Sequence, residues 1–285
     1  MPGMDNLPTL SQTVRLYGLG ANKKLGQHFL LDMNVTDMIA RLALPLEGVH
    51  VAEIGPGPGG LTRSLLKAGA EAVTVIEMDE QFLPALKAIA DVSDNRLSII
   101  KGDALSVDIA TELGPGKPIK IAANLPYNVG TKMLINWLTA DPLFWDQAVL
   151  MFQKEVAQRI VAAPGESAYS RLAILAQSVC TCRMAFDVPA KSFSPPPKVD
   201  SAVVVLEPLP EAERFSNLKL LGELTRAAFG QRRKMLRKSL KPFAKKYGLD
   251  LETWLAAKAV NPTDRPETLP ISAFQELAKS VSLSK

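Results

Sequence analysis

The stretch EIGPGPGG, residues 53–60, follows the apolar run VHVA and precedes LTRSLLKAGA, which has leucines at helical spacing. Glycines between a strand and a helix let the chain turn sharply and let a ligand approach the main chain closely. The spacing Gly55-x-Gly57-x-x-Gly60 satisfies the dinucleotide-binding pattern of βαβ units. The stretch therefore predicts a Rossmann-like α/β fold and leaves the identity of the ligand open.

Further apolar runs recur along the chain at spacings that leave room for a helical crossover between them. They are VHVAEIG (49–55), VTVIEMD (73–79), LSIIKGD (97–103), IKIAANL (119–125) and QAVLMFQ (147–153). Such runs alternating with helical segments predict a mostly parallel sheet that is covered on both faces. Two later runs, CRMAFDVP (182–189) and VDSAVVVLEP (199–208), predict an antiparallel edge and bring the sheet to seven strands.

The pattern changes to helices only after the Pro- and Glu-rich segment EPLPEAERFSN, residues 207–217. We therefore expect three parts: a mobile N-terminal arm with one short helix (1–24), a catalytic α/β domain (25–210) and a small all-helical C-terminal domain (211–285). With 285 residues, of which 47% are hydrophobic, the chain can bury a sizeable core.

The sequence carries no sign of a membrane or secreted protein. No apolar run approaches the roughly 20 residues that a spanning helix needs, and the N-terminus lacks a basic-then-apolar signal. The two cysteines, Cys180 and Cys182, make a poor zinc site without a second pair nearby. We interpret them as reduced core thiols of a cytoplasmic protein and expect no metal site.

Charge is distributed unevenly along the chain. Residues 211–285 carry 15 Lys and Arg against 8 Asp and Glu, whereas the first 210 residues carry 18 against 21. The densest basic run is FGQRRKMLRKSLKPFAKK (229–246), with eight basic residues and no acid. A run of one sign predicts a polyanionic partner rather than an ordinary solvated helix face.

Polar residues end the other predicted strands and help to choose the cofactor. Glu77 ends the second strand at a distance suited to ribose hydroxyls, and Asp103 and Asn124 end the third and fourth. A dehydrogenase also needs a proton donor near the nicotinamide, and neither His28 nor His50 is well placed for that role. The ring of Gly55, Glu77, Asp103 and Asn124 resembles instead the S-adenosylmethionine site of Rossmann-like class I methyltransferases.

The tetrapeptide Asn124-Leu125-Pro126-Tyr127 follows the fourth strand directly and predicts an active site. An exocyclic adenine amine needs hydrogen-bond acceptors that hold its N–H groups while the nitrogen attacks a methyl group. The side-chain oxygen of Asn124 and the carbonyl of Leu125 supply such acceptors, and Pro126 stiffens the turn. Tyr127 offers a flat ring on which a base can stack.

Six motifs in order resemble the ribosomal RNA adenine N6,N6-dimethyltransferase family, in its small-subunit, kasugamycin-sensitivity branch. They are KKLGQHFLLD (23–32), EIGPGPGGLT (53–62), VIEMD (75–79), GDAL (102–105), NLPYN (124–128) and FSPPPKVDSAV (193–203). The resemblance runs from about residue 15 to the end. It implies S-adenosyl-L-methionine as cofactor and two adjacent adenosines in the 3′-terminal hairpin loop of small-subunit (16S) rRNA as targets, each receiving two methyl groups.

The resemblance also implies roles for individual residues. His28, Leu30 and Gly55 hold the methionine end of the cofactor, Glu77 its ribose, Asp103 its adenine, and Asn124 links cofactor and target amine. Phe193 resembles a second stacking aromatic, and Glu53 braces the loop or the methionine amine. Many family members have Asn in place of His28. The phosphates of rRNA are then expected to meet the basic run, at the residues Arg232, Arg233, Lys234, Arg237 and Lys238.

Three alternatives stay open at this point. The large-subunit rRNA methyltransferases of macrolide resistance share the fold, the cofactor and a similar tetrapeptide, although FSPPPKVDSAV favours the small-subunit branch. The chain could act chiefly as an assembly factor on an immature small subunit, where we expect it to bind as a monomer. An NAD-dependent dehydrogenase is the third alternative.

Overall fold

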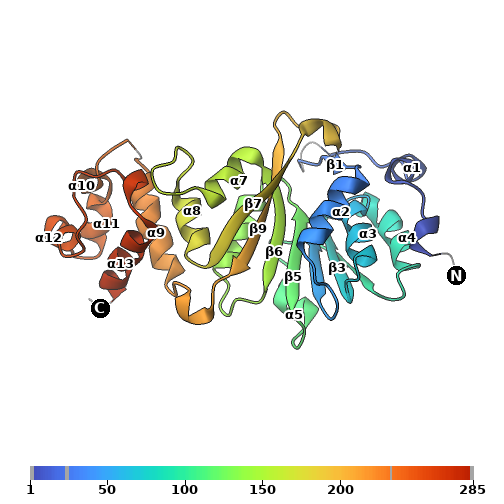
Figure 1. Ribbon diagram of the computed structural model, residues 1–285, viewed down its shortest axis with the longest axis horizontal. Helices are drawn as coiled ribbons and strands as arrows, with labels where there is room; N and C mark the ends of the chain where they lie inside the picture. The colour runs from blue at the N-terminus through green and yellow to red at the C-terminus, as the bar shows by residue number, and fades with distance from the viewer. Residues whose placement is uncertain (1–2, 23–25, 232, 283–285) are drawn as a thin grey trace. The chain divides into compact units, whose positions relative to one another are not determined.

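The computed structural model describes residues 3–22, 26–231 and 233–282, and it divides into two compact units (Figure 1). The first comprises Met1–Ala157 with Arg183–Glu207, and the second Gln158–Cys182 with Pro208–Lys285. The second unit begins close to the predicted boundary at 210, but it also takes residues 158–182. This segment gave no boundary signal because it lies between two strands of the sheet in the sequence.

The seven-stranded sheet has the order β4-β3-β2-β5-β6-β9-β7. Its strands are β2 (His50–Ile54), β3 (Ala72–Glu77), β4 (Leu97–Lys101), β5 (Ile119–Asn124), β6 (Gln147–Gln153), β7 (Cys180–Val188) and β9 (Ser201–Pro208). The strands β2 to β6 are parallel, and Glu53 of β2 is in register with Val75 on one side and Ala122 on the other. β9 runs antiparallel to β6 and lies between β6 and β7. The predicted class I methyltransferase sheet is confirmed.

One helix, α2 (Met33–Leu42), precedes the parallel strands of the first unit, and further helices connect them. The connecting helices are α3 (Gly60–Lys67), the short η3 (Glu80–Phe82), α4 (Leu83–Ala90), α5 (Ile109–Leu113) and α6 (Gly130–Leu138). Asp32, Asp79 and Asp108 cap α2, η3 and α5 by accepting backbone N–H groups. Gly59 precedes α3 with φ +84°, and a Cβ there would collide with Ile89, so the entry to this helix requires glycine.

A second, two-stranded sheet was not predicted. β1 (Phe29–Leu30) pairs antiparallel with β8 (Phe193–Ser194), which follows the short η4 (Ala190–Ser192). Strands of two residues leave no periodic pattern in the sequence, and these partners lie far apart in the chain. The ladder fixes the segment that leads from Gly26 to Leu30.

The N-terminal arm contains η1 (Met4–Asn6) and α1 (Leu10–Leu16), and its described part packs against the first unit. Arg63 of α3 is 7% exposed and donates from Nη1 to the carbonyl of Pro8 at 2.6 Å. Leu10 is only 2% exposed, and Asp5 pairs with Lys67. The expectation of a mobile arm is therefore wrong for residues 3–22. Residues 23–25 lie outside the described part of the chain.

The second unit is helical, with α7 (Lys154–Val161) crossing its boundary. It contains α8 (Arg171–Gln177), η5 (Glu211–Glu213), α9 (Leu218–Phe229), α10 (Leu236–Ser239), α11 (Lys241–Lys246), α12 (Leu251–Ala256), η6 (Pro266–Thr268) and α13 (Ile271–Ser282). Its core includes Tyr169, whose hydroxyl donates to the carbonyl of Leu269 at 3.0 Å. This bond and its buried ring explain why the 158–182 segment belongs to the helical unit.

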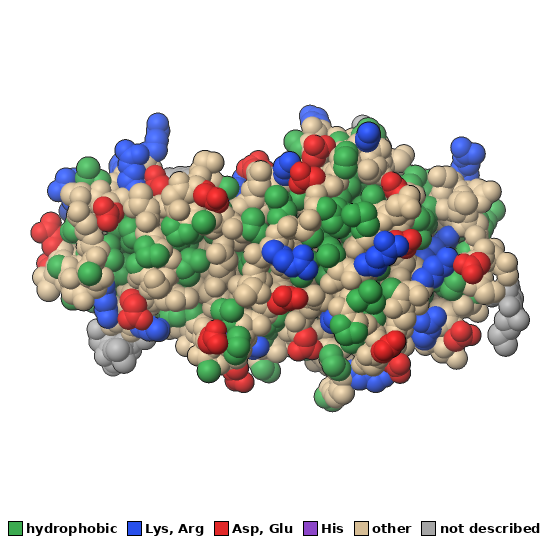
Figure 2. Space-filling view, in the orientation of Figure 1, with side chains coloured by type: hydrophobic (Ala, Val, Ile, Leu, Met, Phe, Trp, Pro, Cys, Tyr) green, Lys and Arg blue, Asp and Glu red, His purple; other side chains and the backbone are tan. Residues whose placement is uncertain are grey.

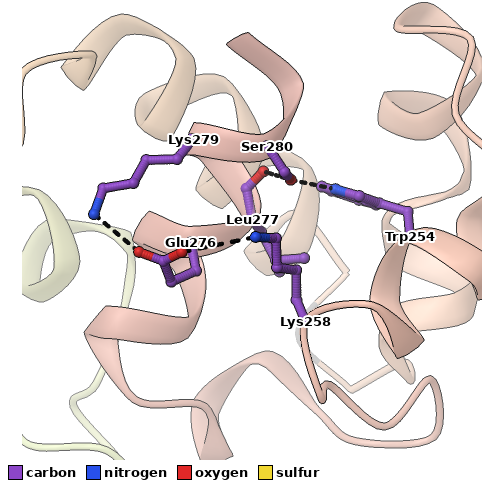
Figure 3. A network of polar contacts seen from close by, with 6 residues as sticks. All are labelled: Trp254, Lys258, Glu276, Leu277, Lys279 and Ser280. Carbon is purple, nitrogen blue, oxygen red and sulfur yellow. Dashed lines mark hydrogen bonds and ion pairs between the residues drawn. The ribbon is translucent and has the colours of Figure 1, made fainter. Parts of the chain in front are cut away.

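A polar network ties α12 to α13 in this unit (Figure 3). Trp254 donates from Nε1 to Ser280 Oγ at 2.8 Å, and Ser280 donates to the carbonyl of Leu277. Glu276 pairs with Lys279 at 2.9 Å and with Lys258 at 3.7 Å. These two lysines therefore share one carboxylate within the unit. Among the described residues, no helix combines the length and apolar character needed to cross a bilayer.

Candidate active site

One cavity opens at the carboxyl edge of the parallel strands, and the ends of β2, β3, β4 and β5 contribute to its wall. Gly55 follows β2, Glu77 ends β3, Asp103 follows β4 and Asn124 ends β5, and all four line the cavity. In an open parallel sheet this edge is where ligands bind. The predicted ring of residues is thus brought together around one space.

The structure also brings the other residues predicted for the cofactor and the target base to this cavity, with the exception of Phe193. His28 and Leu30 line it from the segment at β1, and Leu125, Pro126 and Tyr127 line it from the turn after β5. Phe193 does not line it. Its ring is 4% exposed and packs in the core of the first unit, because β8 turns that side chain inward beside Leu30. This geometry does not support Phe193 as a stacking partner for a base.

The glycine turn leaves its cavity side open. Gly55 and Gly57 have φ of +63° and +53°, values that side chains other than glycine rarely adopt. A Cβ at either position would meet no atom within 4 Å, so space remains in front of the main chain. A ligand can therefore approach the backbone here.

Two buried carboxyl groups, those of Glu77 and Glu53, lie next to the glycine turn and line the cavity. Glu77 is 5% exposed, and its oxygens accept backbone N–H groups from Gly57 at 3.1 Å and Asp79 at 2.8 Å. Burial raises the pKa of Glu77, and these hydrogen bonds oppose the rise. Glu53 is 1% exposed and accepts from Thr62 Oγ1 at 2.6 Å. Burial above all raises the pKa of Glu53 to about 8, so its neutral form dominates near pH 7.

The charged residues that line the cavity are all acidic. They are Glu77 and Asp103, to which Glu53 adds a carboxyl group that is largely neutral near pH 7, and the described lining includes no Lys or Arg. Oxygens in this arrangement suit hydroxyl and amino donors or a cation. The described wall thus offers acidic oxygens and open glycine backbone to a ligand.

The turn after β5 contributes Asn124 and Leu125 to the cavity wall. Asn124 donates from Nδ2 to the carbonyl of His28 at 3.4 Å, while its Oδ1 accepts no hydrogen bond among the described residues. The carbonyl of Pro126 accepts the N–H groups that begin α6, at Val129 and Gly130. The Leu125 carbonyl accepts none of the described loop bonds. Two unused acceptors are thus held on a rigid turn at the end of a strand.

Tyr127 is held by its hydroxyl, which bonds to Ser201 Oγ at 2.7 Å. Its ring lies 5.6 Å from that of His28, with 30° between the planes. His28 is fixed in turn by a 2.8 Å bond between Nδ1 and the carbonyl of Pro195, which requires the proton on Nδ1. Burial raises the pKa of Tyr127, so the phenol stays neutral.

The sequence did not predict Met78 and Gln27 as residues that line the cavity. Met78 is 50% exposed and lines the cavity directly after Glu77, and the only signal was an apolar residue at a strand end. Gln27 also lines it and donates to Asp79 Oδ2 at 3.0 Å. No local pattern could have joined residues 27 and 79, because their contact depends on the tertiary fold.

The basic run extends from the end of α9 through the loop that follows it to α10 and α11, and Pro242 lies in the first turn of α11. Arg233, Lys234, Arg237 and Lys238 are exposed, and no described acid pairs with them. Arg232 lies outside the described residues. Figure 2 shows several Lys and Arg side chains over this part of the second unit. Lys246 differs from them because it pairs with Glu223.

Comparison with known proteins identifies the family of the chain. The sequence profile described as ribosomal RNA adenine dimethylase matches residues 18–282. The chain belongs to this family. It is 50% identical over 278 residues to ribosomal RNA small subunit methyltransferase A of Maricaulis maris, covering 97% of this chain and 96% of that one. The protein of the same name from Rhizobium johnstonii is 51% identical, with coverage of 99% and 100%.

Solved structures agree in fold. A dimethyladenosine transferase from Plasmodium falciparum superposes with a TM-score of 0.75 at 28% identity, covering 90% of this chain and 98% of that one. The 23S rRNA methyltransferase ErmE gives 0.63 at 23% identity, covering 89% and 99%, which supports the fold alone. Because relatives at about 50% identity are small-subunit enzymes, the predicted small-subunit branch is confirmed. The chain is accordingly an rRNA methyltransferase.

The raised pKa of Glu53 predicts a pH-dependent stability. Folding favours the neutral form, so this contribution is complete below the ordinary pKa of 4.5 and is lost as the pH rises through about 8. Glu53→Gln has no proton to lose. Between pH 5 and 8.5, the unfolding free energy of the wild type should therefore fall relative to that of Glu53→Gln, by about 1.4 kcal/mol per pH unit at most.

Denaturant unfolding at several pH values measures this difference. Glu47→Gln, at an exposed position, is the matched control and should follow the wild type. Parallel curves for the wild type and Glu53→Gln would show that the buried carboxyl ionises at its ordinary pKa.

Proposed function

We propose that this protein transfers methyl groups from S-adenosyl-L-methionine to the N6 amines of two adjacent adenosines in the 3′-terminal hairpin loop of small-subunit rRNA, each of which is dimethylated. The observation that carries the proposal is that Asn124 and Leu125 line a cavity with acidic residues and a glycine turn, and that Asn124 Oδ1 and the Leu125 carbonyl accept no hydrogen bond among the described residues. The substrate is rRNA within an immature small subunit, and the protein acts in the cytoplasm as a monomer in the biogenesis of that subunit.

The cavity residues fit the cofactor by their chemistry. Glu77 is oriented by two backbone N–H groups and retains lone pairs for ribose hydroxyls. Asp103 uses Oδ1 to accept from the amide of Leu105 at 2.9 Å, which leaves Oδ2 for an adenine amino group. His28, Leu30 and Gly55 would surround the methionine end, where Glu53 lies behind the turn. When bound, the cofactor supplies an activated methyl group on a sulfonium.

The protein's own contribution to the reaction is to orient the acceptor nitrogen. An adenine amine is a weak nucleophile because its lone pair is delocalised into the ring. Asn124 Oδ1 and the Leu125 carbonyl would accept its two N–H groups and favour tetrahedral geometry at the nitrogen. Nδ2 of Asn124 is already engaged by the His28 carbonyl, which fixes Oδ1 as the acceptor. Tyr127 offers its ring to the base while Ser201 holds its hydroxyl.

The target base must leave its stack before it can enter this cavity. Loop adenosines are suited to this because they cost less to unstack than paired bases. The basic run of the second unit supplies affinity through phosphates without reading the sequence. Arg233, Lys234, Arg237 and Lys238 fit this role because no described acid neutralises them; Arg232 remains part of the prediction from the sequence.

Replacing Asn124 with Ala should reduce methyl transfer by about 10²–10³-fold while the protein stays folded, because one acceptor for the reacting amine is lost. The measurement is incorporation of labelled methyl groups into unmethylated small subunits at saturating cofactor. Asn136→Ala, at an exposed position on α6, is the matched control. Undiminished turnover by Asn124→Ala would refute the assigned role.

The double replacement of Arg233 and Lys234 with Ala should weaken rRNA binding and leave cofactor affinity unchanged. Each lost phosphate contact should lower the slope of log affinity against log salt by about 0.7–0.9. Replacing Lys258 and Lys279 with Ala removes the same charge from the same unit, but both lysines pair with Glu276 (Figure 3). An equal salt slope in both double variants would contradict an RNA contact at the basic run.

A further inference from the structure

One carboxylate beside the cavity receives two side-chain amides. Asp79 Oδ2 accepts from Gln81 Nε2 at 2.6 Å and from Gln27 Nε2 at 3.0 Å. Gln81 is a near neighbour in η3, whereas Gln27 comes from the segment that leads to β1. Hydrogen bonds to a charged acceptor are stronger than neutral ones. Asp79 therefore ties the end of β3 to a distant part of the chain.

Both glutamines are also engaged at their carbonyl ends. Gln81 Oε1 accepts the N–H of Gly20 at 2.9 Å, and Gln27 Oε1 accepts the N–H of Asn22 at 2.8 Å. Each side chain thus donates to Asp79 and accepts from the backbone of the N-terminal segment. We name Gln27, Asp79 and Gln81 the glutamine latch.

The latch connects to the cavity on the cofactor side. The backbone N–H of Asp79 donates to Glu77 Oε1 at 2.8 Å, one of the two bonds that orient this buried carboxylate. Asp79 Oδ1 also accepts the N–H of Gln81 and caps η3. The position of the Asp79 backbone therefore sets the direction in which Glu77 presents its lone pairs.

The latch connects to the cavity on the target side as well. His28 directly follows Gln27, and its carbonyl accepts from Asn124 Nδ2 at 3.4 Å. Gln27 is thus held by Asp79, and the next residue, His28, is held by Asn124. The same short segment joins the carboxylate assigned to ribose with the amide assigned to the amine.

We propose that Gln27 is a positioning residue for cofactor recognition: through Asp79 it holds Glu77 in the orientation that binds the ribose hydroxyls. The inference rests on the proposed function and adds to it a residue that acts on the ribose through Asp79 and Glu77. A role limited to fastening the N-terminal segment would change stability without changing which ligand groups the cavity recognises.

The test compares two ligands in one variant. Gln27→Glu has nearly the same shape but turns a carboxylate oxygen toward Asp79 Oδ2, so the latch opens. S-adenosylhomocysteine should bind this variant about 10-fold more weakly than the wild type. Its analogue without the ribose 2′ and 3′ hydroxyls should bind both proteins nearly equally, because it makes no contact with Glu77. Titration calorimetry measures all four affinities, and their ratio gives the coupling between latch and ribose.

Two further variants make the result specific. Gln27→Ala removes the donor without adding charge and should give the same loss of discrimination between the ligands. Gln158→Glu adds the same charge at an exposed position of α7 and should behave as the wild type. An equal loss on both ligands, or a lower melting temperature with unchanged discrimination, overturns the positioning role alone. Failure of the wild type to bind S-adenosylhomocysteine overturns the proposed function and the latch together.

Discussion

The parallel register of β2, β3, β4 and β5 determines which residues come together at the cavity. Because the four strands run in one direction and in step, their carboxyl ends lie at one edge, and the residue that ends each strand faces one space. Gly55, Glu77, Asp103 and Asn124 are separated by 20 to 30 residues in sequence and become neighbours only through this register. A slip by one residue would turn the side chains of Glu77 and Asn124, which end their strands, to the other face of the sheet.

The two units carry functional side chains of opposite charge. The cavity wall of the first unit is acidic and suits a cationic nucleoside, and burial keeps the Glu53 carboxyl largely neutral there. The second unit carries exposed basic residues between α9 and α11 that no described acid neutralises, and these suit a polyanion. A cationic ligand needs acidic side chains and a polyanion needs basic ones, and the chain carries these two sets of side chains on separate units.

The strand pattern made the sheet predictable, since its continuous apolar runs correspond to β2 to β6 within about two residues at each end. The NLPY turn was predictable too, because Asn124 directly follows such a run. What could not be predicted depends on distant contacts: the two-residue ladder of β1 with β8, the burial of Phe193 that follows from it, and the bond from Gln27 to Asp79. The N-terminal arm was misjudged for the same reason, since the contact of Pro8 with Arg63 has no local signature.

Asn124 Oδ1 and the Leu125 carbonyl are proposed to orient the N6 amine of an adenosine for methyl transfer. Incubating the pure protein with labelled methyl donor and unmethylated small subunits, then mapping the label, tests it most directly. The account predicts label only on N6 of two adjacent adenosines in the 3′-terminal hairpin loop, rising to two methyl groups on each. Label on another atom or another base, or none at all, would contradict it.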